Sequence, residues 1–154
     1  MRRTDKEISD PKIIQEILAG SQICRLGLVD NGEAYIVPVN YAFKDGCIYI
    51  HSASEGRKIE ILKRNPHVTF EVEYESETIK GEVPCKWGTK YRSVMGRGKI
   101  EICDDAESKK NGFDLIMKKY GGEFTPPYDE SALAKAVILK FKAKSLTAKQ
   151  SGIW

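Results

Sequence analysis

The chain has 154 residues, of which 41% are hydrophobic and 31% are charged. This length is enough for one domain with its own core but hardly for two, so we expect a single domain over residues 1–154. The formal net charge is only +3, and 25 Lys and Arg are interspersed with 22 Asp and Glu. Because no basic stripe stands out, the sequence does not favour nucleic-acid binding.

Targeting and metal-binding signals are also weak. The N-terminal residues Met1 to Glu7 are charged and lead into no apolar run, so no signal peptide is predicted. No apolar run reaches the ~20 residues that a membrane-spanning helix needs. The four cysteines form no Cys-x-x-Cys pair, and the two histidines do not complete a zinc pattern. We therefore expect a cytoplasmic protein with reduced thiols, no metal and no membrane contact.

The first predicted element is a helix that opens at Asp10-Pro11 and ends at Gly20. Asp is a good N-cap, Pro fits the first helical position, and apolar residues recur between them at helical spacing. The pattern then changes to two strands, residues 22–29 and 34–43. The turn Asp30-Asn31-Gly32 joins them as a hairpin, because Asn-Gly tolerates the positive φ that tight turns require.

Pro38 lies inside the second of these strands. A proline donates no hydrogen bond to a neighbouring strand, so it belongs at an edge or a bulge, and it marks a place where the sheet opens. A second turn, Asp45-Gly46, leads into a strand at residues 47–52. A short helix at residues 55–64 follows and ends before Pro66.

The second half of the chain continues this mixture. Strands are predicted at residues 67–74, 78–83, 91–103 and 136–146, and helices at residues 104–121 and 130–135, with a loop at residues 122–129. Strands that arrive as hairpins argue against a doubly wound parallel sheet. About six antiparallel strands with helices at their ends and corners most economically form a small closed or nearly closed barrel, because closure removes exposed edges.

The stretch YIHSASEGRKIE, residues 49–60, joins a predicted strand to a predicted helix. Ser52 is followed three residues later by Glu55, which matches a capping box. This pattern predicts the N-terminus of the helix near Ser52 or Ser54.

Gly56, Arg57 and Lys58 follow at once. Two cations in a first helical turn are repelled by the helix dipole, whereas an anion there would offset their charge, and phosphate is the usual choice. Gly56 would let such an anion approach the backbone. The alternative is a capped surface helix that carries two solvated basic residues.

A second unusual stretch covers residues 85–99. Gly96 and Gly98 lie within a strand pattern and on the same face, so they clear a strip of that face of side chains. A flat ligand or another backbone could approach there, and a bend of the barrel is the structural alternative. Trp87 and Tyr91 are packing residues or stack on a ring.

Several short motifs occur along the chain in order, and these are Tyr35-Ile36-Val37-Pro38-Val39-Asn40-Tyr41, His51-Ser52-Ala53, Gly56-Arg57-Lys58, Cys85-x-Trp87 and Tyr91-x-Ser93-Val94-x-Gly96-x-Gly98. Together they resemble the FMN-binding split-barrel proteins of the pyridoxamine 5'-phosphate oxidase superfamily. The branch that they resemble most is related to the 5-nitroimidazole antibiotic resistance proteins. The resemblance implies a mainly β fold, a six-stranded antiparallel Greek-key split β-barrel. It also implies a homodimer with FMN in two clefts between the subunits.

The resemblance further implies which residues bind FMN. Ser52, Arg57 and Lys58 would contact the phosphate, and His51 would line the same cleft. The remaining contacts would come from two strands. One strand would place Pro38, Val39 and Asn40 along the isoalloxazine ring. The other would contribute Ser93, Val94 and Gly96, either from the partner subunit or beside the ring.

The implied activity is that of an FMN-dependent oxidoreductase that reduces small molecules such as nitroaromatics. The flavin would carry the electrons, and His51 could give a proton to the product, because the pKa of histidine lies near working pH. Alternatively, His51 only hydrogen-bonds the phosphate or the backbone. Cys85 is either a redox-active thiol or a packed cysteine. The rival function is a flavin- or haem-binding module without turnover, since a fold does not determine a function.

Overall fold

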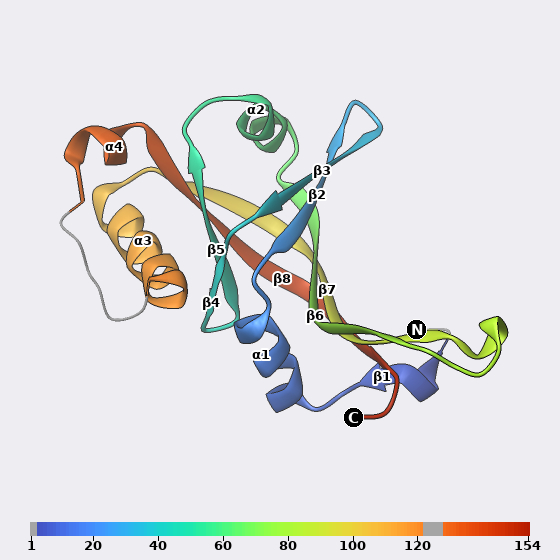
Figure 1. The fold of residues 1–154 in the computed structure, drawn as a ribbon. Coiled ribbons are helices and arrows are strands. Elements are labelled where there is room, and N and C mark those ends of the chain that lie inside the picture. The colour runs from blue at the N-terminus through green and yellow to red at the C-terminus, as the bar shows by residue number, and fades with distance from the viewer. Residues whose placement is uncertain (1–2, 122–127) are drawn as a thin grey trace.

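The computed structural model describes residues 3–121 and 128–154. In them, one antiparallel sheet curls around a hydrophobic core, and helices lie at its ends and corners (Figure 1). The helices are α1 (Pro11–Gly20), α2 (Arg57–Arg64), α3 (Ala106–Tyr120) and α4 (Glu130–Ala134), with 3-10 turns η1 (Thr4–Lys6) and η2 (Pro84–Lys86). The strands are β1 (Glu7–Ile8), β2 (Cys24–Asp30), β3 (Glu33–Val39), β4 (Ala42–Lys44), β5 (Cys47–Ala53), β6 (His67–Ile79), β7 (Gly88–Cys103) and β8 (Ala136–Ser151).

The strands pair in the order β3-β2-β6-β7-β8-β5-β4, and β1 pairs with β8 near its C-terminal end. Strands β3 and β4 are consecutive in the sequence but lie at opposite ends of this order, so the curled sheet stays open between them. Of the eight strands, β1 and β4 have two and three residues, which leaves six longer ones. The predicted fold, a mainly antiparallel β split barrel with flanking helices, is confirmed.

The core fills the inside of the curled sheet. Phe70 of β6 and Phe141 of β8 meet edge to face with their ring centroids 5.1 Å apart, and both are almost fully buried. Helix α1 adds Ile17 and Leu18 to the same cluster. A smaller cluster fixes α3 to the sheet, and Ile138 of β8 belongs to it. Packing on both clusters sets where the ends of β3, β5 and α2 lie.

Both predicted hairpin turns are present. Asn31 and Gly32 have φ of 52° and 89°, and Asp45 and Gly46 have φ of 51° and 74°. Positive φ at both central residues is the conformation for which Asn-Gly and Asp-Gly are suited. Pro38 lies in β3, the strand at one edge of the sheet order, as its missing N–H requires.

Other predicted boundaries are wrong. Residues 34–43 are not one strand but belong to β3 and β4 on opposite edges of the sheet, because the chain crosses the opening between them. Residues 67–79 form one strand, β6, whose pairing with β7 shifts register between Tyr74 and Glu77. Residues 80–83 are not a strand, and β8 continues to Ser151.

Helix α3 begins at Ala106 rather than Asp104, because the side chain of Asp105 accepts a hydrogen bond from the backbone N–H of Ser108 at 2.9 Å and caps it. Most of the loop predicted at residues 122–129 lies outside the described residues. Among the helices that the structure describes, none has the length and apolar character to cross a bilayer.

Candidate functional site

Helix α2 begins at Arg57, later than predicted. The predicted capping box is wrong, because Ser52 pairs within the β5–β8 ladder and Ser54 donates its backbone N–H to the carbonyl of Lys135 at 2.9 Å. The N-cap is Gly56, which makes no side-chain hydrogen bond to the helix. Its φ of 108° is a conformation that glycine adopts without strain.

The first turn of α2 therefore presents N–H groups that no side chain at the N-cap position satisfies. A Cβ placed on Gly56 would meet no atom within 4 Å, so the space beside this backbone is open. Glu60 is the acidic residue of the first turn, whereas Arg57 and Lys58 are basic. We call Gly56, Arg57 and Lys58 the α2 site. Free N–H groups, the partial positive charge of a helix N-terminus and two cations together favour an anion.

Arg57 connects the α2 site to the β2–β3 hairpin. Its Nη2 lies 3.1 Å from Oδ2 of Asp30, and its guanidinium lies 4.7 Å from the ring centroid of Tyr35. Asp30 also pairs with Arg64, whose Nη2 lies 2.8 Å from Oδ1. One carboxylate thus pairs with two arginines, so the group formed by Asp30, Arg57 and Arg64 keeps a net positive charge. The sequence did not reveal this partner, because Asp30 and Arg57 are 27 residues apart.

The charge of Lys58 influences His51. Burial lowers the pKa of Lys58, whose side chain is half-buried. Burial is also the larger cause that lowers the pKa of His51, and the charge of Lys58 is the smaller one. An anion beside these two groups would favour their charged forms. Such a response is expected of a site that takes an anion.

Ser52 does not share the orientation of its neighbour. Along β5, Ile48, Ile50 and Ser52 are buried and face the core, whereas His51 lies on the other face, where its side chain is only partly covered. Ser52 is only 7% exposed. The structure therefore brings His51 to the vicinity of Lys58 but turns Ser52 toward the core.

An aromatic surface that sequence reasoning missed lies beside His51. The ring of His51 lies 6.0 Å from that of Phe113, which lies 5.7 Å from that of Tyr128. The hydroxyl of Tyr128 donates to Oδ1 of Asp114 at 2.7 Å and so holds its ring in place. The sequence offered only the helical spacing of Phe113, which is equally typical of a core residue.

The two strand segments implied to bind the cofactor lie in different places. In β3, Pro38 is exposed and Val39 is half-buried, and Asn40 is exposed just beyond the strand. Tyr35 of the same strand contacts Arg57, so the start of β3, three residues before Pro38, adjoins the α2 site. Ser93, Val94 and Gly96 do not, because β7 is separated from β5 by β8 and from β3 by β2 and β6. Val94 is fully buried in the core.

The strip that Gly96 and Gly98 were predicted to clear is filled. A Cβ on Gly96 would overlap the ring of Phe70, and one on Gly98 would overlap the backbone carbonyl of Lys142, next to the register shift between β7 and β8. The ligand hypothesis for this strip is wrong. The structural alternative, a bend in the barrel wall that brings strands close together, is what the structure shows.

The 3-10 turn η2, which contains Cys85, lies in the connection at the far end of the long β6–β7 hairpin (Figure 1). The side chain of Cys85 is exposed. All four cysteines are free. Among residues 3–121 and 128–154, no three His, Cys, Asp or Glu side chains gather as metal ligands.

An antiparallel sheet curled into a barrel that stays open between β3 and β4, with helices at its ends and corners, is the architecture of the split-barrel proteins. The chain belongs to the pyridoxamine 5'-phosphate oxidase family, whose family model matches residues 10–150. No curated protein matches the chain.

Solved structures agree with this assignment. A protein from Bacteroides thetaiotaomicron, provisionally described as a 5-nitroimidazole antibiotic resistance protein, is 30% identical, with a TM-score of 0.84 over 94% of this chain and 86% of that chain. The flavocytochrome Anf3 from Azotobacter vinelandii is 17% identical, with a TM-score of 0.86 over 99% and 72%. The FAD and heme binding protein from Mycobacterium smegmatis is 15% identical, with a TM-score of 0.87 over 97% and 75%. The last two show similarity of fold alone.

Proposed function

We propose that the protein is a flavoprotein that binds FMN, with the phosphate at the α2 site and the cofactor held between two copies in a homodimer. The observation that carries this proposal is the start of α2, where Arg57 and Lys58 flank a helix N-terminus without a side-chain N-cap and Gly56 leaves the backbone open. These residues fit a phosphate in charge, in hydrogen-bond donors and in space.

Each remaining site residue has a role in this proposal. The segment Pro38, Val39 and Asn40 would border the ring system, since it continues the strand whose Tyr35 contacts Arg57. Ser93 would come from the partner subunit. Val94 and Gly96 could offer only backbone groups, because the first is buried and the second packs on Phe70. Ser52 faces the core and would support the site from beneath rather than from the open side.

We propose further that the protein is an oxidoreductase acting on small molecules such as nitroaromatics. FMN, when bound, would supply the electron transfer. The aromatic surface of Phe113 and Tyr128 beside His51 suits a flat ring. The similar Bacteroides protein, with its provisional description, supports this substrate class.

His51 has a defined part in such a reaction. Because burial and Lys58 lower its pKa below 6.5, its imidazole is neutral near pH 7 and can accept a hydrogen bond. A bound phosphate would weaken the effect of Lys58 and return the pKa toward neutrality. His51 would then hold a proton next to the substrate.

The test compares FMN with riboflavin, which lacks the phosphate. In Arg57→Ala/Lys58→Ala, two charge-assisted contacts of ~1.5–3 kcal/mol each are lost, so FMN affinity should fall on the order of a hundredfold or more from the micromolar or better value of the parent protein. Riboflavin affinity should change little. The fold should persist, because Arg64 still pairs with Asp30. Lys63→Ala, at the exposed last turn of the same helix, is the control and should bind FMN normally.

Two results would overturn the proposal. Equal losses for FMN and riboflavin would show that Arg57 and Lys58 do not contact the phosphate. Unchanged flavin fluorescence and melting temperature on adding FMN to the parent protein would rule out FMN binding itself.

A second candidate, a flavin- or haem-binding module without turnover, is supported by the names of the two less similar structures, a flavocytochrome and an FAD and heme binding protein. The absorbance spectrum of the purified protein separates the two. A flavin gives the spectrum of a yellow protein and haem gives a strong Soret band, and chromatography of the released cofactor distinguishes FMN from FAD.

A further inference from the structure

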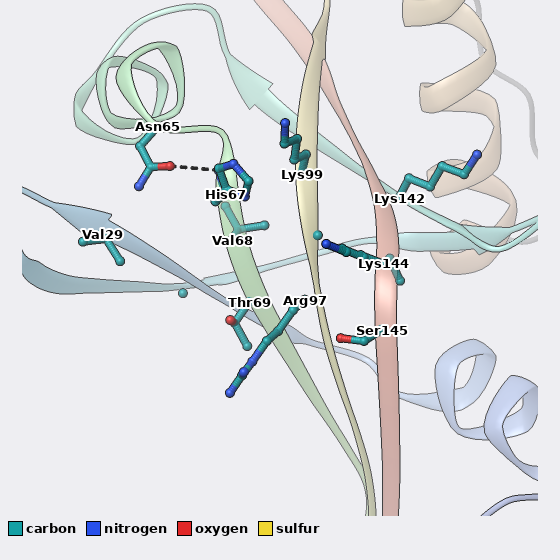
Figure 2. Close-up of a pocket in the computed structure, with 13 residues that line it drawn as sticks. Val29, Asn65, His67, Val68, Thr69, Arg97, Lys99, Lys142, Lys144 and Ser145 are labelled. Atoms are coloured by element: carbon teal, nitrogen blue, oxygen red, sulfur yellow. Dashed lines mark hydrogen bonds between the residues drawn. The ribbon is translucent and has the colours of Figure 1, made fainter.

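A hollow of about 870 Å³ lies on the outer face of the sheet, over β2, β6, β7 and β8 (Figure 2). We call it the outer pocket, and its charged lining residues are Arg97, Lys99, Lys142 and Lys144. Arg97, Lys99 and Lys142 are exposed, whereas Ile100 and Phe141 beside them in sequence are buried, so the pocket opens away from the core. Within the described part of the chain, no Asp or Glu lines it.

The strand register places two lysines, Lys99 and Lys142, directly opposite each other. His67 of β6 is opposite Lys99 of β7, which is opposite Lys142 of β8. In the next row, Arg97 stands between Thr69 and Ser145. Side chains directly opposite on neighbouring strands are close enough to interact, and like charges there destabilise a sheet. Among the described residues, no ion pair engages the four Lys and Arg side chains of the outer pocket.

The rows on either side are balanced. In one, Arg25 pairs with Glu71 at 3.0 Å, and in the other Lys140 is opposite Glu101. The excess of positive charge is therefore confined to the outer pocket and is not a general property of this face.

The floor of the outer pocket is small and apolar. Gly27, Val29, Val68, Gly98 and Ala143 contribute to it. At the register shift Gly98 is opposite Ala143 while Arg97 is opposite Ser145, so Lys144 is an additional residue in β8. Figure 2 shows its side chain extending from β8 toward β7.

We propose that the outer pocket binds a nucleotide, with its phosphates on the Lys and Arg side chains and its base on the apolar floor. Cations spread over two strands suit more than one phosphate, and a floor bare of large side chains suits a flat ring. The volume lies within the range of about 300–1,000 Å³ that is typical of small-molecule sites. The proposal does not depend on FMN, because the outer pocket and the α2 site share no residue.

The test is calorimetric titration of ATP into the protein as purified, with its flavin if present, at low salt. ATP should bind the parent protein, and Lys142→Gln should weaken this binding about tenfold. Lys140→Gln is the matched control, since it removes the same charge from the same strand and the same face two residues away, and should change affinity less than about twofold. Melting temperatures check that both variants fold.

Tripolyphosphate and adenosine separate the two parts of the ligand. Tripolyphosphate should bind more weakly than ATP, and adenosine more weakly still. Equal binding of ATP and tripolyphosphate would overturn the role of the base. Equal losses in Lys142→Gln and Lys140→Gln, no binding of ATP at millimolar concentration, or displacement of bound flavin by ATP would each overturn the site. A change of oligomeric state in Lys142→Gln without ATP binding to the parent would show a subunit contact instead.

Discussion

Gly56 and Gly96 illustrate two different reasons for a glycine in one small barrel. Gly56 has positive φ and open space around it. A glycine is therefore suited to this position because it adopts the backbone conformation found at the start of α2. Gly96 lies in regular strand, and its missing side chain makes room for the ring of Phe70. The first is expected to matter for anion binding and the second for stability.

Replacing Gly96 tests this distinction. Gly96→Ala should lower the free energy of unfolding by about 1–3 kcal/mol, because the methyl group would overpack the core against Phe70. FMN affinity of the folded fraction should stay near that of the parent protein. Urea unfolding of the cofactor-free protein measures the first quantity and fluorescence titration the second. Normal stability combined with weak FMN binding would contradict the packing role.

His51 should make stability depend on pH. Its folded pKa is lowered below 6.5, so as pH falls through 6.5 the unfolded chain takes up the proton first and the folded state loses stability. The loss grows until the pH passes the folded pKa and is then constant. His51→Gln has no imidazole to protonate, so this contribution to the pH dependence of stability is absent. Between about pH 7 and about pH 5 the variant should therefore lose less stability than the parent protein. Melting curves of the cofactor-free proteins measure it, and parallel profiles would contradict the surroundings assigned to His51.

At the scale of elements, the C-terminal turn of α3 attaches that helix to the start of β2 and to β4. The hydroxyl of Tyr120 donates to the carbonyl of Gln22 and accepts from the backbone N–H of Tyr41 at 3.1 Å. The Nζ of Lys119 donates to the carbonyl of Ser21 at 2.6 Å. These bonds satisfy backbone groups where the chain leaves α1 and crosses the opening of the barrel.

Removing the hydroxyl of Tyr120 should loosen this attachment. Tyr120→Phe loses two hydrogen bonds and should cost about 1–3 kcal/mol of unfolding free energy, because the bonded backbone groups keep only part of their access to water. Tyr91→Phe is the control, since the hydroxyl of Tyr91 makes no hydrogen bond to the described residues. Equal stability of the two variants would contradict the attachment.

The row of opposite lysines, Lys99 of β7 and Lys142 of β8, should cost stability in the absence of a ligand. Lys99→Gln removes one of the two charges, so it should stabilise the ligand-free protein by up to about 1 kcal/mol at low salt. The gain should shrink near 1 M salt, because the Debye length there is only about 3 Å. Thermal unfolding at two salt concentrations measures it. Destabilisation by Lys99→Gln at low salt would mean that the row has a partner within the fold.

For the whole molecule, the open sheet and its exposed apolar residues bear on the proposed dimer. Ile36 of the edge strand β3 is 65% exposed. It lies on the outer face, opposite Gly27 of β2, and is not among the residues that line the outer pocket. An exposed apolar surface on an edge strand is a common subunit contact.

The dimer is tested directly by light scattering. The parent protein should have the mass of a dimer at micromolar concentration, and Ile36→Glu should shift it toward the monomer and weaken FMN binding at the same time. Lys63→Ala, distant on α2, should leave the mass unchanged. A monomeric mass for the parent protein with FMN bound would contradict a cofactor held between subunits.

Features that depend on neighbours in sequence were determined by the sequence alone. The turns at Asn31-Gly32 and Asp45-Gly46, the edge position of Pro38 and the mainly antiparallel β fold all follow from local φ preferences, from missing hydrogen-bond donors and from alternation. The family resemblance was likewise readable, because its motifs occur in order along the chain.

Features that depend on register were decided only by the tertiary structure. Pairing of Ser52 with Val137 moved the start of α2 to Arg57, and a turn 27 residues away supplied Asp30 as the partner of Arg57. The same holds for the outer pocket, whose Lys and Arg side chains come from two strands and are brought together only by the pairing of β7 with β8. Such contacts join residues far apart in sequence, and the packing of the core, which no local pattern specifies, sets the register that brings them together.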